Sequence, residues 1–311
     1  TITYRGYSKY HLKSICGKKF KYFTSCSYLG LHSDRRIIKK IQSSKELRKM
    51  KLLYSSSRTR TISELEENVN VKLNKIFNPY VVVQFQNIHS AHLGVIPLIL
   101  SGKFPNIRFQ SNGCHCIVDK FSHQSIKCLV GVFSQFCEVT FTDFLDFDQL
   151  TLINKRIKQN NKTMVMIGDS LGSMGRIYDI NRIIGFVEKN KGYVYFDDAH
   201  GTSIVGKNGS GFVMNQMGCK LNDRVFISTG LTKAFGSHGA VMLLPNKEQA
   251  NFIKTYATTY SFSGPISNPN LMASDVCCDI HLSKEIYLLQ SNLRKNINIF
   301  DLNFEYEKIS P

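Results

Sequence analysis

Long apolar runs are missing from this sequence of 311 residues. Its longest runs, such as residues 93–100 (LGVIPLIL), fall far short of the roughly 20 consecutive apolar residues that a membrane-spanning helix needs. Hydrophobic residues still make up 42% of the chain, which is enough to fill the core of a large domain. We therefore expect a folded, soluble protein without a membrane span, and we exclude a disordered chain.

Paired cysteine motifs are also missing. The nine cysteines include no CxxC pair, because Cys114 and Cys116 are two residues apart and Cys277 and Cys278 are adjacent. Neither spacing suits a zinc site. The cysteines are scattered through apolar stretches, where reduced thiols pack as small hydrophobic side chains. This usage predicts a cytoplasmic protein with no bound metal.

Acidic residues are scarce in the first sixty residues, which carry 16 Lys or Arg against Asp34 and Glu46. This segment therefore has a net charge of +14. The other 251 residues carry 24 basic and 21 acidic residues, a net charge of only +3, and the whole chain has a formal net charge of +17. Such a cluster is typical of nucleic-acid binding, but zinc-finger spacing and the aromatic signature of an RNA-binding sheet are both absent. We therefore interpret residues 1–50 as a basic N-terminal segment with a solvated helix face, and we expect no nucleic-acid partner.

From about residue 80 the sequence alternates short β-rich runs with longer helical patterns. The expected strands lie at 81–84, 116–119, 138–141, 163–167, 193–196, 225–228 and 240–244. The expected helices lie at 92–100, after Ser122, at 147–159, 179–189 and 247–258, and along one continuous pattern at 271–298. This alternation predicts an α/β fold, a mostly parallel sheet with helices on both faces.

Gly-Pro and Asn-Pro steps near residue 265 mark a domain boundary. The chain is thus divided into the basic segment at 1–50, a large domain at 51–265 and the start of a small C-terminal domain at 266–311.

Two segments, at 193–211 and 225–240, end predicted strands with polar groups and glycine-rich turns. Asp197 closes the first strand, His200 follows three residues later, and Lys233 follows the second strand. Ligands of parallel sheets sit at the carboxyl ends of the strands. A lysine there can form a Schiff base, and an acid can keep a pyridine nitrogen protonated. These residues predict pyridoxal phosphate (PLP) chemistry.

The order of several motifs resembles the α-oxoamine synthase family of fold-type-I PLP enzymes. The motifs are GKKFKYFTSCSYLGL at 17–31, SSSRTRTISELEENV at 55–69, VDKFSHQSI at 118–126, GDSLGSMGRIYDI at 168–180, DDAHG at 197–201 and LTKAFGSHGA at 231–240. The resemblance implies the PLP-dependent transferase fold type I, as in aspartate aminotransferase, with a PLP-binding large domain and a small C-terminal domain.

The resemblance also implies roles for individual residues. Lys233 would bind the cofactor and then transfer protons, and Asp197 would pair with the pyridine nitrogen. His200 would hydrogen-bond the phenolic oxygen, and His123 would lie over the ring. Three more residues are implied as cofactor contacts: Ser173, Thr229 and Thr232. A surface lysine, a turn acid, a turn serine and satisfied core histidines are the alternative interpretations.

Some positions depart from the family pattern. Ile88 and His89 replace the glycine-aromatic pair that begins the first cofactor-binding helix, so the phosphate contacts there cannot be assigned. Ser203 stands where a glycine is usual. Asp198 takes the place of the usual glutamate, and we expect it to order its turn.

The implied reaction is the decarboxylative condensation of an amino acid with an acyl thioester, acyl-CoA or an acyl carrier protein, to an α-amino ketone. An aminotransferase, a non-catalytic subunit of the same fold and a basic binding module are the alternatives. The intact Lys233 favours an enzyme. The basic segment is expected to attract coenzyme A phosphates or an acidic carrier protein.

Two further expectations come from the family layout. The turn-rich stretch at 261–265 is expected to reach the cofactor of a second subunit in a homodimer. About half of a small domain, with an arginine for the substrate carboxylate, is expected to be missing, because Arg294 is the only arginine after Lys233. The chain as given is therefore expected to bind amino acids weakly.

Overall fold

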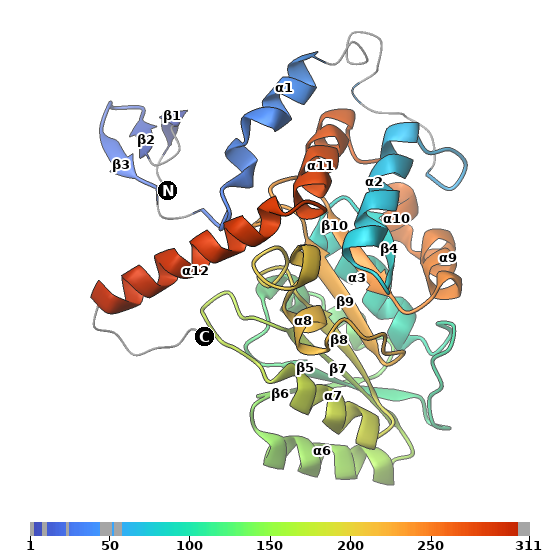
Figure 1. Cartoon of the computed structure of the whole chain (residues 1–311). Coiled ribbons are helices and arrows are strands. Elements are labelled where there is room, and N and C mark those ends of the chain that lie inside the picture. The colour runs from blue at the N-terminus through green and yellow to red at the C-terminus, as the bar shows by residue number, and fades with distance from the viewer. Residues whose placement is uncertain (1–2, 8–10, 23–24, 44–51, 53–57, 304–311) are drawn as a thin grey trace.

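A seven-stranded sheet forms the centre of the computed structural model, which describes residues 3–7, 11–22, 25–43, 52 and 58–303. Its strands are β4 (Val81–Phe85), β5 (Cys114–Asp119), β6 (Glu138–Thr142), β7 (Thr163–Asp169), β8 (Tyr193–Asp197), β9 (Val225–Gly230) and β10 (Ala240–Leu244). They follow the order β4-β10-β9-β8-β7-β5-β6 (Figure 1). The two pairs that contain β10 are antiparallel and the other four pairs are parallel, so the predicted mostly parallel sheet is confirmed.

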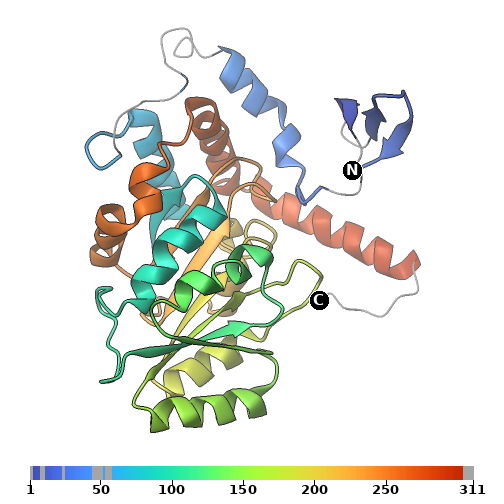
Figure 2. The same cartoon turned by 180° about the vertical axis from the view of Figure 1, so that it is seen from behind.

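Helices cover both faces of this sheet (Figures 1 and 2). On one face lie α2 (Glu64–Ile76), α6 (Phe147–Gln159), α7 (Ile180–Lys189), α8 (Phe212–Gln216) and α11 (Asn268–His281). On the other lie α3 (Ile88–Leu100), α4 (Gln124–Lys127), α5 (Val130–Phe133), α9 (Lys247–Tyr256) and α10 (Thr258–Phe262). Two helices lie near the chain ends, α1 (Arg35–Ser43) and α12 (Glu285–Asn303).

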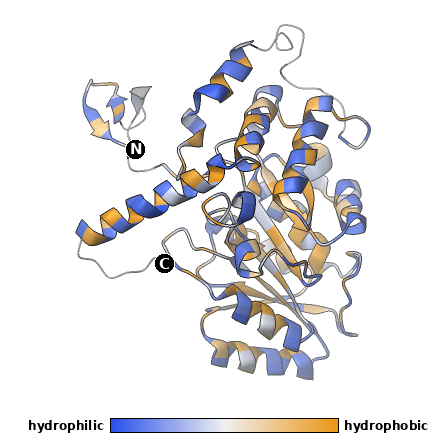
Figure 3. Cartoon of the chain, in the orientation of Figure 1, coloured by the Kyte–Doolittle hydropathy of each residue, from blue (hydrophilic) through white to orange (hydrophobic). Residues whose placement is uncertain are grey.

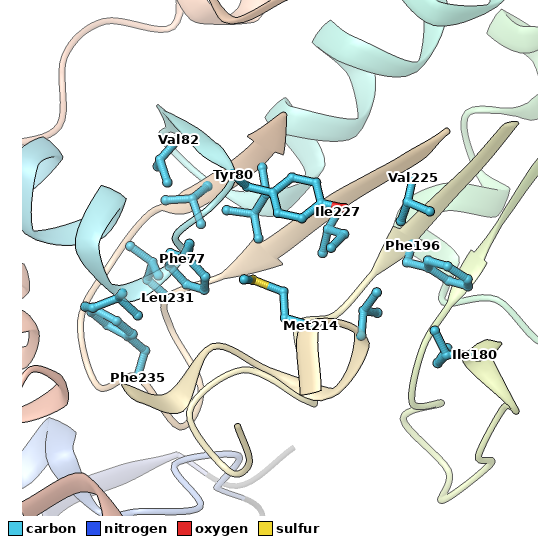
Figure 4. Packing of buried hydrophobic residues seen from close by; sticks show 14 of the residues in the cluster. Phe77, Tyr80, Val82, Ile180, Phe196, Met214, Val225, Ile227, Leu231 and Phe235 are labelled. Carbon is cyan, nitrogen blue, oxygen red and sulfur yellow. The ribbon is translucent and has the colours of Figure 1, made fainter. Parts of the chain in front are cut away.

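Adjacent residues of each strand pack into different cores. In β8, Val194 and Phe196 pack with the helices of the first face, whereas Tyr195 packs with those of the second. Figure 4 shows part of the first core, in which Phe196 lies with Ile180 of α7 and Met214 of α8. Because every residue of β8 is buried, its sequence is apolar at each position from Tyr193 to Phe196 and does not alternate between apolar and polar residues. Figure 3 shows the same hydrophobic centre.

The continuous helical pattern predicted at 271–298 is wrong, because the structure has two helices there. The chain leaves the helix after His281, and α12 begins at Glu285. Ser283 accounts for the break, since its hydroxyl donates to the Ile280 carbonyl at 2.8 Å and accepts the Glu285 N–H at 3.1 Å. A side chain that bonds the backbone on both sides competes with the helical hydrogen bonds.

The basic N-terminal segment contains strands that the sequence did not predict. β1 (Tyr4–Tyr7), β2 (His11–Ser14) and β3 (Lys19–Lys21) form a small antiparallel sheet away from the main sheet. Each strand has only three or four residues, too few for an alternating pattern to stand out. The predicted helix appears as α1, which buries only Ile37 and exposes most of its charged side chains. Most of the remaining basic stretch, at 44–51, lies outside the described residues.

The last helix, α12, projects away from the body of the protein (Figure 1). It mixes hydrophobic and hydrophilic residues along its length (Figure 3) and leaves Leu288 and Leu302 exposed. Among the described helices, none is long and apolar enough to cross a membrane. The division of the chain at residue 265 stays a prediction.

Candidate active site

Polar side chains gather where three neighbouring parallel strands end. Asp169 is the last residue of β7, Asp197 is the last residue of β8, and Lys233 lies in the turn that follows β9. Asp169 and Asp197 stand opposite each other in the parallel register. His123 follows β5 on the far side of β7. The sheet thus brings together residues that are up to 110 positions apart, at the edge where α/β proteins bind ligands.

Lys233 is the end of a chain of three hydrogen-bonded side chains. Its Nζ lies 2.6 Å from Nε2 of His200, and Nδ1 of His200 lies 2.7 Å from the hydroxyl of Tyr28. Burial raises the pKa of Tyr28 to about 12, so its hydroxyl stays protonated. Burial, together with the nearby charge of Lys233, lowers the pKa of His200 to about 4.

The directions of these two hydrogen bonds depend on the charge of Lys233. When the Lys233 amine is neutral, it accepts from Nε2–H of His200 and Tyr28 donates to Nδ1; when it is an ammonium, it donates to Nε2 and Nδ1–H donates to Tyr28. Burial also lowers the pKa of Lys233, against the opposing charge of Asp197. A larger fraction of the amine is therefore neutral, and the neutral amine is the nucleophilic form.

Tyr28→Phe is expected to remove the hydrogen bond to Nδ1 of His200 without unfolding the protein. One neutral hydrogen bond contributes about 0.5–1.5 kcal/mol, so Lys233 should form a Schiff base with an added aldehyde roughly two- to tenfold more slowly. Nitrogen NMR of labelled histidine should show His200 divided between its two tautomers. Tyr256→Phe, at an exposed position on α9, is the matched control and should change neither result.

Asp197 is buried and has two neighbours besides the lysine. Its Oδ1 accepts the backbone N–H of Ala199 at 2.9 Å, and its Oδ2 lies 3.4 Å from Nε2 of His92. His92 on α3 is fully buried and also lies 3.2 Å from the hydroxyl of Ser228. The carboxyl group is therefore held in one orientation, with hydrogen-bonding groups against both oxygens.

Asp198 orders the turn, as the sequence predicts. It is buried, and one carboxyl oxygen accepts the hydroxyl of Ser170. A Cβ on Gly201 or Gly211 would come within 2.2 and 2.1 Å of its carboxyl oxygens, so both positions need glycine. Burial raises the pKa of Asp198 to about 7. The glycine-rich loop after β8 is thus wrapped around this side chain.

Ser203, which stands in place of a family glycine, has a structural reason for being there. Its backbone is left-handed, with φ of 73°, and its hydroxyl lies 2.8 Å from Nε2 of His281 on α11. Nδ1 of His281 donates to the Cys277 carbonyl, so Nε2 accepts the serine proton. The His281 ring stacks on Phe235, two residues after Lys233, at 4.2 Å between centroids. His281 therefore links α11 to both loops of the site.

Of the other residues that the sequence predicts for the site, His123 and Thr229 are hydrogen-bonded to the groups described above. His123 caps α4, and its backbone N–H donates to Oδ2 of Asp169 at 3.0 Å. The Thr229 hydroxyl points to the Asp198 carbonyl, 3.3 Å away. Two predicted residues, Ser173 and Thr232, are exposed and not joined to the others by a described hydrogen bond. Arg294, the one arginine after Lys233, is also exposed.

Three residues of the site escaped the sequence analysis. Asp169 ends a strand, as Asp197 does, so the same rule applied one strand earlier would have found it. Tyr28 lies in the YLGL motif, although no pattern shows that it reaches His200. His92 begins a predicted helix, and its sequence context does not distinguish it from an ordinary core histidine.

Comparison with known proteins identifies relatives of this chain. The sequence pattern of the family described as Aminotransferase class I and II matches residues 27–276. An 8-amino-7-oxononanoate synthase of Buchnera aphidicola subsp. Baizongia pistaciae is 27% identical over 294 residues, or 92% of this chain and 69% of that protein. The same enzyme of Alkaliphilus oremlandii is 29% identical over 72% of this chain, which spans only 53% of that protein's length.

Solved structures share the fold. A serine palmitoyltransferase of S. paucimobilis, solved with PLP and myriocin, superposes with a TM-score of 0.79 at 17% identity, over all of this chain and 75% of that one. An 8-amino-7-oxononanoate synthase of Francisella tularensis superposes with a TM-score of 0.65 at 19% identity, over 93% of this chain and 78% of that one. These names are those that the resemblance to α-oxoamine synthases predicts, and the predicted fold type is confirmed.

Proposed function

The chain belongs to the aminotransferase class I and II family, and from this premise we propose that it is a PLP-dependent acyltransferase. The proposed reaction condenses an amino acid with an acyl thioester, acyl-CoA or an acyl carrier protein, and releases carbon dioxide to give an α-amino ketone. The names of the related enzymes and the motifs at 197–201 and 231–240 support this choice over transamination.

The contact between Lys233 and His200 carries the proposal, because it places an amine whose pKa is lowered by burial beside a ring nitrogen that can carry a proton. This donor set suits PLP: an amine for its aldehyde, an N–H for its phenolic oxygen and, at Asp197, an acid for its ring nitrogen. When bound, the cofactor supplies an electron sink for the charge that develops at the Cα of the amino acid.

The protein's own residues then have separate tasks. Lys233 holds the cofactor and, once the amino acid has taken its place, moves the proton at Cα. His200, oriented by Tyr28, holds the phenolic oxygen through Nε2. His123, fixed by Asp169, covers one face of the ring.

The phosphate group is proposed to lie at the start of α3. A Cβ on Gly230 would lie 3.8 Å both from Ile88, the first residue of α3, and from the hydroxyl of Thr232. Helix N-termini favour anions, and Thr232 offers a hydroxyl at the same place. Thr229 is the weaker candidate, because its hydroxyl is turned to Asp198. The role of Ser173 stays a prediction that its exposed position does not support.

The visible spectrum of the protein with added PLP tests the proposal. We expect a new band on adding PLP, a change of that band with one amino acid of a panel, and carbon dioxide release only when an acyl thioester is also present. If a 2-oxo acid in place of the thioester yields a new amino acid, the protein is an aminotransferase. A spectrum that never departs from free PLP would contradict both activities.

We also propose that the enzyme is a homodimer. Phe262, in the predicted interface stretch at 261–265, is 85% exposed, and Met174 beside Ser173 is 88% exposed. We expect these two side chains to pack against the second subunit, because the resemblance implies that the stretch at 261–265 reaches it.

Sedimentation is expected to show a dimer that Phe262→Asp converts to monomer with loss of cofactor binding. Leu152→Asp, at an exposed position on α6, is the control and should stay dimeric. A wild-type monomer with full activity would contradict the dimer.

The proposed compartment is the cytoplasm. All nine cysteines are free; four of them are buried, two half-buried and three exposed. Free thiols in this number favour a reducing compartment.

A further inference from the structure

Asp169 is a buried carboxyl group that uses only part of its hydrogen-bonding capacity. It is 3% exposed at the end of β7, where Oδ2 accepts the backbone N–H of His123 at 3.0 Å. Within the described part of the chain, Oδ1 has no hydrogen-bond partner. A buried carboxylate oxygen without a partner is costly, and protonation removes the charge that makes it so. The neutral acid therefore suits this place better than the carboxylate.

A second carboxyl group strengthens this preference. Asp169 pairs with Asp197 in the parallel register, and paired residues of neighbouring strands point to the same face. Two carboxyl groups so placed resist being ionised together. Asp197 has the Ala199 N–H on one oxygen and His92 against the other, whereas Asp169 has one backbone N–H. The negative charge of the pair is thus better placed on Asp197.

The surrounding charges agree with this assignment. Burial, followed by the charge of Asp197, raises the pKa of Asp169 to about 8, against the opposing effects of the His123 N–H and the Lys233 ammonium. The titratable groups that face Asp169 come from five elements or their adjoining turns: Asp119 on β5, His123 before α4, Tyr178 before α7, Asp197 on β8 and Lys233 after β9.

We propose that Asp169 is a further positioning residue of this site, a carboxylic acid that fixes the backbone of His123 and leaves the negative charge of the carboxyl pair to Asp197. The inference rests on the proposed function for the roles of His123 and Asp197. The protonation of Asp169 can be measured without cofactor or turnover, so the two proposals can fail separately.

Infrared spectroscopy of the cofactor-free protein tests the protonation. We expect the carbonyl stretch of a carboxylic acid at neutral pH, which fades as the pH rises through about 8 and is missing in Asp169→Asn. Asp198 contributes its own acid band, which Asp169→Asn should leave in place. Asp148→Asn, at an exposed position on α6, is the control and should leave both bands. A spectrum unchanged by Asp169→Asn would overturn the proposal.

Kinetics of the loaded enzyme test the positioning. Asn imitates the neutral acid, so kcat of Asp169→Asn at neutral pH should stay within about threefold of the wild type, whereas Asp169→Ala loses the bond to His123 and should fall roughly tenfold. Above pH of about 8 the ionised Asp169 raises the pKa of Lys233, so the wild type should fall behind Asp169→Asn. Equal losses in the Asn and Ala variants at neutral pH would overturn the positioning role.

Discussion

Lys233→Ala is expected to abolish the borohydride-reducible attachment of PLP and to lower the condensation rate by roughly 10³-fold or more, since both the covalent link and the proton-transfer base are lost. The side chain is half-buried between the ends of β8 and β9, so its removal should leave the fold intact. Mass spectrometry of the reduced wild type should place the pyridoxyl group on Lys233 alone.

The controls for this prediction distinguish the loss of the Lys233 amine from a general loss of structure. Lys254→Ala removes an exposed lysine of α9 and should leave attachment and rate unchanged. A small primary amine added to Lys233→Ala should restore part of the rate, because it replaces the missing base. A pyridoxyl group found on another lysine would show that the site has been assigned to the wrong residue.

The strands and their order of appearance could be predicted because the sheet is buried on both faces. Runs such as YVYF at 193–196 are apolar at every position, and long amphipathic patterns separate them. The same reasoning failed at 281–285, where no glycine or proline interrupts the pattern and the break depends on the hydroxyl of Ser283. It failed again in the N-terminal segment, whose strands of three or four residues are too short to show a period.

The candidate site, like the fold, could be predicted from the sequence only in part. Strand ends could be placed on one edge of the sheet from sequence alone, and so Asp197, His200 and Lys233 could be brought together. Which way a side chain points could not be predicted, since Thr229 turns inward to Asp198 while Thr232 stays exposed. Contacts between distant segments, such as that of Tyr28 with His200, depend on loop geometry that no local pattern encodes.

Asp197→Asn is expected to keep the fold and bind PLP but to lower turnover by about two orders of magnitude or more, because a neutral amide no longer keeps the ring nitrogen protonated. The amide oxygen can still accept the Ala199 N–H, whereas the amide nitrogen can donate to His92 only when Nε2 of that ring is unprotonated. We expect the larger part of the loss to be electronic, because the Ala199 contact that orients the side chain is kept.

A cofactor analogue with a methylated ring nitrogen distinguishes this explanation from a general loss of structure. Its ring carries a permanent positive charge, so it should restore much of the turnover of Asp197→Asn, while the same analogue should give Lys233→Ala no such gain. Asp148→Asn is the matched control for the substitution itself and should behave as the wild type with either cofactor. Near-normal turnover of Asp197→Asn with PLP would remove Asp197 from the site. A failure of the analogue to help would mean that Asp197 acts through the arrangement of His92 and Ala199 rather than through the charge of the ring.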